Sequence, residues 1–77
     1  MKDLLIFILK AIVQKPDKIT VESSEKDDVV NFNLSVDKED MGRVIGKNGK
    51  IIKAIRTVLR IKALKEGKHI NLILLEQ

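Results

Sequence analysis

The stretch Val44-Ile45-Gly46-Lys47-Asn48-Gly49-Lys50-Ile51-Ile52 decides the fold of this 77-residue chain. Two glycines stand three apart, with a lysine and an asparagine between them and isoleucines on both sides. Glycine adopts positive φ and allows another backbone to come close, so the pattern predicts a short loop that ends one helix and starts the next. The start of a helix favours an anion. Lys47 and Lys50 add full positive charges at the same place.

Helical periodicity continues on both sides of this loop. Asp37 is predicted to cap a short helix that continues to about Ile45, because an aspartate side chain accepts backbone N–H groups at a helix start. The apolar positions of that helix are Met41, Val44 and Ile45. Residues 50–64 predict a second helix that ends before Gly67. Its wide apolar face consists of Ile51, Ile52, Ile55, Val58, Leu59 and Ala63.

Alternating patterns predict strands before and after the paired helices. Residues 18–24 and 29–36 alternate between apolar and polar side chains, and the short polar turn between them implies an antiparallel pair. Residues 69–75 predict a last strand with apolar side chains on both faces. This two-sided apolarity suggests an interior position in the sheet or a second contact surface.

Residues 2–14 predict a helix that is apolar nearly all round and ends before Lys15-Pro16. Such a helix must be buried on more than one side, which in so small a domain favours a partner subunit. The alternative is a core helix whose second side is covered by loops of the same chain. Phe7 and Phe32 both occur in apolar patterns and are predicted to lie in the core.

The predicted order is therefore α-β-β-α-α-β, with the glycine loop between the paired helices. Residues Ile45 to Ile52 match I-G-x-x-G-x-x-I, and in this context the chain resembles the KH (K homology) domains, which hold RNA with a GXXG loop. The resemblance implies an α+β fold: a single type II KH domain, with a three-stranded mixed sheet packed by helices on one face. It would span residues 1–77, with the core over about 28–75 and an N-terminal helix-strand extension over about 2–24.

A chain this short, with Gly42-Arg43-Val44-Ile45 leading into the loop, is similar to the small bacterial KhpA family. That resemblance implies a cytoplasmic RNA-binding protein of post-transcriptional regulation, an RNA chaperone linked to cell elongation and division. It also implies a homodimer, a heterodimer with a larger Jag/KhpB-type KH protein, or both.

The positive charge is concentrated in one part of the chain. The formal net charge is +4, but residues 38–68 contain ten Lys and Arg against three Asp and Glu, which leaves −3 for the remainder. Lys53, Arg56 and Arg60 share one flank of the second paired helix, with Lys50 one turn earlier. The asymmetry indicates a polyanion partner, although a solvated charged face explains the charge alone about equally well.

These observations predict a site for single-stranded RNA. The glycine backbone approaches the sugar-phosphate chain, and the lysines and arginines neutralise phosphates, so affinity should fall with salt. By analogy with the family, bases lie in a groove lined by Val44, Ile45, Ile52 and the strand Val29–Val36. The full set of predicted RNA-binding residues is Arg43, Val44, Ile45, Gly46, Lys47, Asn48, Gly49, Lys50, Ile52, Lys53 and Arg56.

Other functions fit the sequence less well. A KH-like module that binds mainly proteins is favoured by the apolar first helix and last strand, whereas the lysine and asparagine between the glycines favour RNA. An enzyme is not expected, because the sequence has no nucleophile-base pair and no Walker motif. No metal or other cofactor is implied, since there is no cysteine and one histidine, His69. No membrane partner is expected, because no apolar run approaches ~18 residues.

Overall fold

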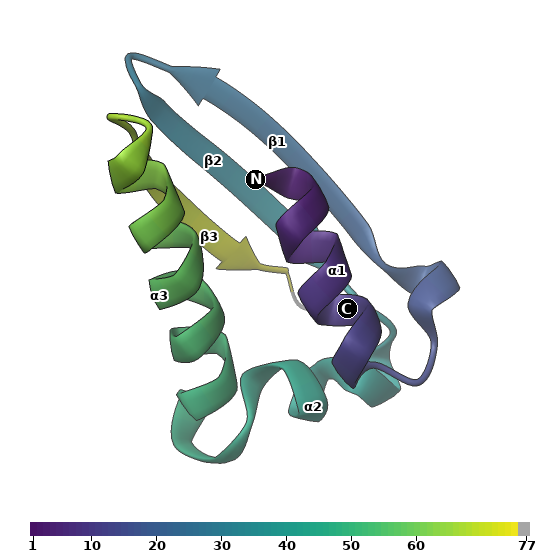
Figure 1. Cartoon of the computed structure of the whole chain (residues 1–77). Coiled ribbons are helices and arrows are strands. Elements are labelled where there is room, and N and C mark those ends of the chain that lie inside the picture. The colour runs from purple at the N-terminus through teal and green to yellow at the C-terminus, as the bar shows by residue number, and fades with distance from the viewer. Residues whose placement is uncertain (76–77) are drawn as a thin grey trace.

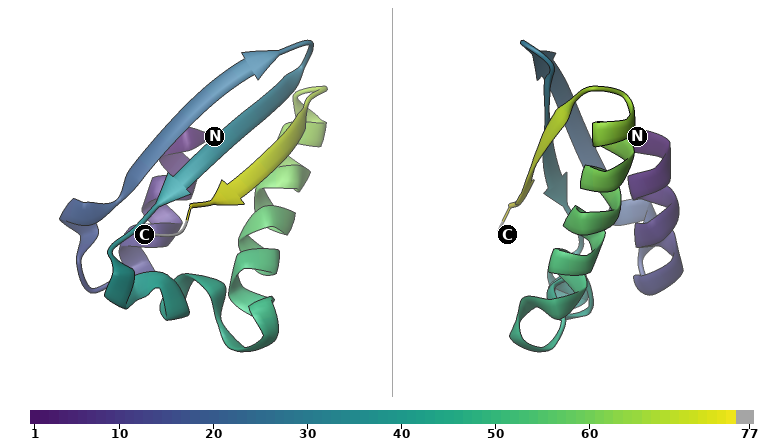
Figure 2. Two further views of the ribbon diagram at one scale, coloured as in Figure 1. Left: turned by 180° about the vertical axis from the view of Figure 1, so that it is seen from behind. Right: turned by 60° about the vertical axis from the view of Figure 1, so that its left-hand side comes forward.

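The computed structural model describes residues 1–75, which form two layers. Figure 1 shows helices α1 (Lys2–Ile12) and α3 (Lys50–Lys65) lying in front of the sheet, with the short helix α2 (Met41–Ile45) below them. Figure 2 shows from the side that these helices cover one face of the sheet and leave the other face open. The α-β-β-α-α-β order and the one-sided packing are as predicted.

The sheet of the described chain is mixed, in the order β1-β2-β3. Strand β1 (Thr20–Lys26) pairs antiparallel with β2 (Val29–Ser35) through a turn at Asp27 and Asp28, both with positive φ. Strand β3 (His69–Leu74) pairs parallel with β2. Of the two alternatives for the last strand, the interior position is wrong, because β2 takes the central position and β3 is an edge. Its second apolar face is exposed, as at Ile73.

The core lies between the sheet and the helices. Each strand contributes the side chains of its helix-covered face, and α1, α2 and α3 contribute one buried stripe each, as alternation and helical spacing predict. The buried hydrophobic residues are Leu5, Leu9, Val21, Val30, Phe32, Leu34, Val36, Val44, Ile55, Leu59, Ala63 and Leu72.

A buried carboxylate joins the N-terminal helix to the paired helices. Asp40 is almost fully buried, and its two carboxylate oxygens accept hydrogen bonds from the backbone N–H groups of Gln14 and Lys15, each at 3.0 Å. Helix α1 ends at Ile12 instead of continuing to Gln14, because these N–H groups are directed to Asp40 and not to the preceding turn. Asp37 is a cap as predicted, but of a 3-10 turn, η2 (Lys38–Asp40), that precedes α2.

The two phenylalanines have opposite environments. Phe32 is 1% exposed and lies in the core, as predicted, but Phe7 is 73% exposed on the outer side of α1. The prediction of a core position for Phe7 is wrong, because Leu5 and Leu9 already occupy the side of α1 that faces the sheet. The apolar surface nearly all round α1 therefore remains partly uncovered.

Candidate nucleic-acid interface

The loop between α2 and α3 has a left-handed backbone at three positions. Helix α2 ends at Gly46, with φ of 75°, and a 3-10 turn, η3 (Lys47–Gly49), leads into α3. Asn48 and Gly49 have φ of 57° and 73°. Only glycine adopts such values without cost, and asparagine tolerates them better than most residues. The residue types in this loop therefore match the conformation that each position requires.

The first glycine of the loop is required by packing as well as by conformation. A Cβ atom on Gly46 would lie 2.6 Å from Cγ1 of Ile51, whereas a Cβ on Gly49 would meet its nearest neighbour, Lys53, at 3.9 Å. The Gly49 N–H donates to the Gly46 carbonyl at 3.1 Å, which closes the turn. The loop is thus packed at Gly46 and open at Gly49.

The polar side chains at the tip of the loop are accessible. Lys47 and Asn48 are exposed, and Lys50 and Lys53 are exposed on the first turn of α3. The N-terminus of this 16-residue helix carries a partial positive charge next to those lysines. In residues 1–75, the salt bridges tie Lys15, Arg43 and Lys68 to acids, and none involves the lysines of the loop. The cationic charge at the loop therefore remains available to an anion.

Two ion pairs elsewhere in the chain raise the pKa values of the lysines that form them. The Lys15 amine donates a hydrogen bond to Glu39 at 2.9 Å, which together with nearby Asp37 raises the pKa of Lys15. Likewise, the hydrogen bond from Lys68 to Glu25, at 2.7 Å, raises the pKa of Lys68. Both lysines contribute to joining segments of the fold.

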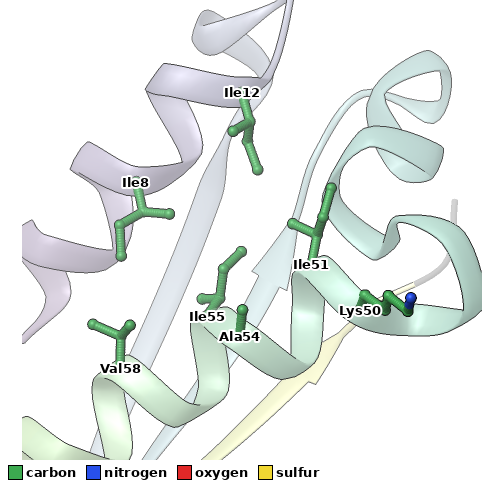
Figure 3. Close-up of a pocket in the computed structure, with 7 residues that line it drawn as sticks. All are labelled: Ile8, Ile12, Lys50, Ile51, Ala54, Ile55 and Val58. Carbon is green, nitrogen blue, oxygen red and sulfur yellow. The ribbon is translucent and has the colours of Figure 1, made fainter.

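Helix α3 has two chemically different flanks on either side of its buried stripe. Lys53, Arg56 and Arg60 follow one another at helical spacing on one flank, as predicted. The opposite flank is apolar, and Ile51 and Val58 face α1 from it. Lys50 departs from the predicted row, because it lies among the residues that line the space between α1 and α3. In Figure 3 its nitrogen points away from the isoleucines.

The basic flank lies beside strand β3. Arg56 is half-buried, and its Nη2 donates a weak hydrogen bond of 3.4 Å to the carbonyl oxygen of Leu72 in β3. Sequence reasoning missed this contact, since nothing local in the chain connects the two residues. Strand β3 is thus the strand that Arg56 contacts. In the strand Val29–Val36, which was predicted to line the groove, most apolar side chains are buried in the core and Val29 is half-buried.

The apolar residues that were predicted to line the site differ in how deeply they are buried. Val44 is fully buried, so it holds α2 on the core and its side chain cannot contact a bound base. Ile45 is 36% exposed and Ile52 is half-buried, so both present surface to solvent as well as to the core. Arg43 is largely exposed and lies 3.9 Å from a carboxylate oxygen of Asp40. The accessible part of the predicted set is thus Arg43, the loop, the lysines and arginine at the start of α3, and two isoleucines.

A second feature, an apolar pocket of about 380 Å³, lies between α1 and α3. Figure 3 shows Ile8 and Ile12 of α1 pointing toward the apolar flank of α3, where Ala54, Ile55 and Val58 complete the lining. This pocket is on the other side of α3 from the basic flank. Helix α3 therefore has the row of Lys53, Arg56 and Arg60 on one side and the mainly apolar lining of the pocket on the other.

The described residues lack two other kinds of site. Within residues 1–75, no group of three His, Asp or Glu side chains is arranged to hold a metal ion. Over the same range, every helix is too short or too polar to cross a membrane.

A mixed sheet covered on one face by helices, with a GXXG loop between two of them, defines this chain as a KH domain. The family model described as "KhpA/KhpB, KH domain" matches residues 2–74. The chain belongs to that family. It is 43% identical over 76 residues to the RNA-binding protein KhpA of Listeria monocytogenes, covering 99% of this chain and 100% of the relative.

Relatives in other bacteria are similar over nearly the same length. The RNA-binding protein KhpA of Clostridium acetobutylicum is 46% identical over 70 residues, which cover 91% of this chain and 93% of the relative. The protein of the same name in Chlamydia trachomatis is 35% identical over 77 residues, which cover 100% of this chain and 99% of the relative. The match therefore includes the first helix and strand as well as the loop.

Proposed function

We propose that this protein binds short single-stranded RNA in the cytoplasm through Gly46-Lys47-Asn48-Gly49 and acts in post-transcriptional regulation as an RNA chaperone linked to cell elongation and division. The observation that carries the proposal is the loop itself. Two exposed polar residues stand between glycines of positive φ, at the start of a helix whose flank is basic. The relatives are named RNA-binding proteins, which supports the RNA-binding part of the proposal.

The mechanism follows from the two accessible surfaces. Phosphates lie against the loop backbone and the lysines, while bases lie toward Ile45 and Ile52 beside the edge strand β3. A KH loop clamps about four nucleotides, so one copy holds RNA weakly. The surface suits a single strand, because a duplex hides the base edges that such a groove contacts.

The decisive experiment measures binding to a labelled pool of short single-stranded RNAs at two salt concentrations. The variant Lys47→Asp with Asn48→Asp reverses the charge at residue 47 and adds a negative charge at residue 48, both exposed, and circular dichroism checks its fold. We expect wild type to bind, more weakly at high salt, and the folded variant to lose binding. Equal binding by both proteins would refute the role of the loop, and no binding by wild type would refute the proposed function.

We further propose that the chain pairs with a second KH-domain chain, as a homodimer or with a larger Jag/KhpB-type KH protein. The support is the uncovered apolar surface that α1 and α3 present, where Val58 is 44% and Ile61 53% exposed. Contiguous exposed apolar surface is typical of an interaction site. Pairing two domains would raise the avidity for RNA without new contacts to it.

Light scattering tests the pairing. Val58→Glu places a charge on the apolar flank of α3, and Arg60→Glu is the matched control on the basic flank. We expect wild type and Arg60→Glu to have the mass of a pair, and Val58→Glu to be monomeric. A monomeric wild type that also fails to bind a KhpB-type KH domain would contradict the proposal.

A further inference from the structure

The side chain of Ile51 lies between the two surfaces described above. On one side it packs against the loop, because its Cδ1 lies 2.9 Å from the place that a Cβ on Gly46 would occupy. On the other side it lines the apolar pocket between α1 and α3, as Figure 3 shows. It is 38% exposed, so a molecule that enters the pocket can reach it. One side chain therefore contacts both the loop and the pocket.

This side chain is stiff. Isoleucine is branched at Cβ, and in a helix it occupies nearly always a single χ1 rotamer. Ile51 lies in the first turn of α3, so its Cβ and Cγ1 are held by the helix. Closely packed side chains transmit a displacement to their neighbours. A contact made in the pocket can therefore press Ile51 against Gly46 but cannot simply rotate it away.

Gly46 connects Ile51 to the tip of the loop. Its carbonyl accepts the Gly49 N–H at 3.1 Å, and this hydrogen bond closes the turn that presents Lys47 and Asn48. The left-handed backbone of Gly46, with φ of 75°, sets the direction in which the turn leaves α2. A shift of Gly46 would therefore change the closing hydrogen bond and the position of the two exposed polar residues.

The wall of the pocket opposite Ile51 is anchored. Helix α1 forms this wall, and the chain directly after α1 is bound to the Asp40 carboxylate through the N–H groups of Gln14 and Lys15. Because Asp40 immediately precedes α2, the end of α1 and the start of α2 are held together. Filling the pocket is thus expected to act on Ile51 before it moves α1 away from α2.

We propose that Ile51 is a positioning residue for the RNA loop, and that it couples RNA binding to occupation of the pocket by a second KH-domain chain. This inference rests on both parts of the proposed function, the RNA loop and the pairing, and adds that each event favours the other. A partner that fills the pocket holds Ile51 against Gly46 and fixes the loop in the conformation that RNA contacts. By linkage, RNA then raises the affinity of the pair by the same factor.

The test measures the dissociation constant of the pair by light scattering of a dilution series, without RNA and with a saturating pool of single-stranded RNAs of about four nucleotides. One KH loop clamps about four nucleotides, so these RNAs engage one domain and avidity does not contribute. We expect RNA to tighten the wild-type pair by about fivefold or more. For Ile51→Ala, which removes the atoms that pack on Gly46, we expect a weaker pair that RNA does not tighten. Ile51→Val lacks only Cδ1 and should show a reduced factor.

Val58→Ala is the matched control. Val58 lines the same pocket, about two turns along α3 from Ile51, and is not among the nearest neighbours of Gly46. This variant should pair more weakly, but RNA should tighten its pair by the wild-type factor. Circular dichroism checks the fold of every variant.

Three results would overturn the inference while leaving the proposed function in place. They are a wild-type pair that RNA does not tighten, an equal tightening of wild type and Ile51→Ala, and a loss of the factor in Val58→Ala as well. The second result would assign the effect to neutralisation of charge by RNA. If wild type does not bind RNA or does not pair, that part of the proposed function fails and this inference fails with it.

Discussion

Ile51 fills the space that the missing side chain of Gly46 leaves open. A Cβ at residue 46 would lie 2.6 Å from Cγ1 and 2.9 Å from Cβ of Ile51. Because Ile51 also lines the pocket between α1 and α3, it touches the loop on one side and the apolar surface on the other. The conformation of the loop therefore depends on a side chain of the neighbouring helix, as well as on its own glycines.

The two loop glycines should consequently differ in their tolerance of alanine. Gly46→Ala forces positive φ on a residue with a Cβ and also displaces Ile51, so we expect it to lower the free energy of unfolding by roughly 3 kcal/mol. Gly49→Ala meets only the backbone strain, with an expected loss of about 1 kcal/mol. Urea unfolding of the two variants measures the difference. Equal losses would show that Ile51 moves aside without cost.

The buried carboxylate of Asp40 should make the fold sensitive to acid. The hydrogen bond from the Gln14 N–H, together with that from Lys15, lowers the pKa of Asp40 below its ordinary value. The ionised form is thus favoured in the folded state. Its contribution to stability is complete above the unfolded pKa of about 3.9 and is lost as the pH falls through the lower folded pKa.

Thermal unfolding of Asp40→Asn across this pH range tests the assignment. We expect the variant to unfold at a lower temperature than wild type at neutral pH. The amide of asparagine has one accepting oxygen, and its NH2 group donates, so it can accept a hydrogen bond from only one of the two backbone N–H groups. The two midpoints should converge as the pH falls below 3.9, where the wild-type carboxyl gains its proton. Asp17→Asn, at an exposed position, is the control and should follow wild type throughout. A constant gap between Asp40→Asn and wild type would argue against the carboxylate as the cause.

The local features of this fold were predictable from the sequence, and the errors concern contacts between distant residues. Turn chemistry at Gly46 and Gly49 and the helical period after them depend on neighbours in the chain. The end of α1 depends on Asp40, which lies 26 residues after Gln14. Periodicity could not show which side of an all-apolar helix the sheet covers, and so it misplaced Phe7.

The same distinction applies to the candidate site. The loop and its basic flank are adjacent in sequence, so the pattern alone indicated them. The strand that borders the flank was not predictable, because Arg56 and Leu72 are 16 residues apart and no local pattern shows that they meet in the folded chain. Likewise, the alternation in β2 predicted inward side chains correctly but could not distinguish the core from a groove.

Phe7 and Leu9 should respond in opposite ways to truncation. Leu9 is fully buried, so Leu9→Ala should lower the free energy of unfolding by about 2–5 kcal/mol. Phe7→Ser removes a side chain that is 73% exposed, and in dilute monomeric protein it should change that free energy by less than about 0.5 kcal/mol. Urea unfolding at low protein concentration distinguishes them. A large loss for Phe7→Ser would place this side chain in the core after all.

The two flanks of α3 should differ in their effect on the salt dependence of RNA binding. Each phosphate contact to a single strand contributes about 0.7 to the slope of log affinity against log salt concentration. Lys53 and Arg60 lie on the basic flank, so Lys53→Gln and Arg60→Gln should each make the slope shallower by about 0.7. Lys62 is exposed on the same helix, four residues after Val58 and therefore on the apolar flank. Lys62→Gln removes the same charge but should leave the slope unchanged. This control distinguishes the loss of a direct phosphate contact from a lower net charge of the domain. If all three variants lowered the slope alike, RNA would respond to the total charge of the domain, and the alignment of its backbone along the basic flank would be refuted.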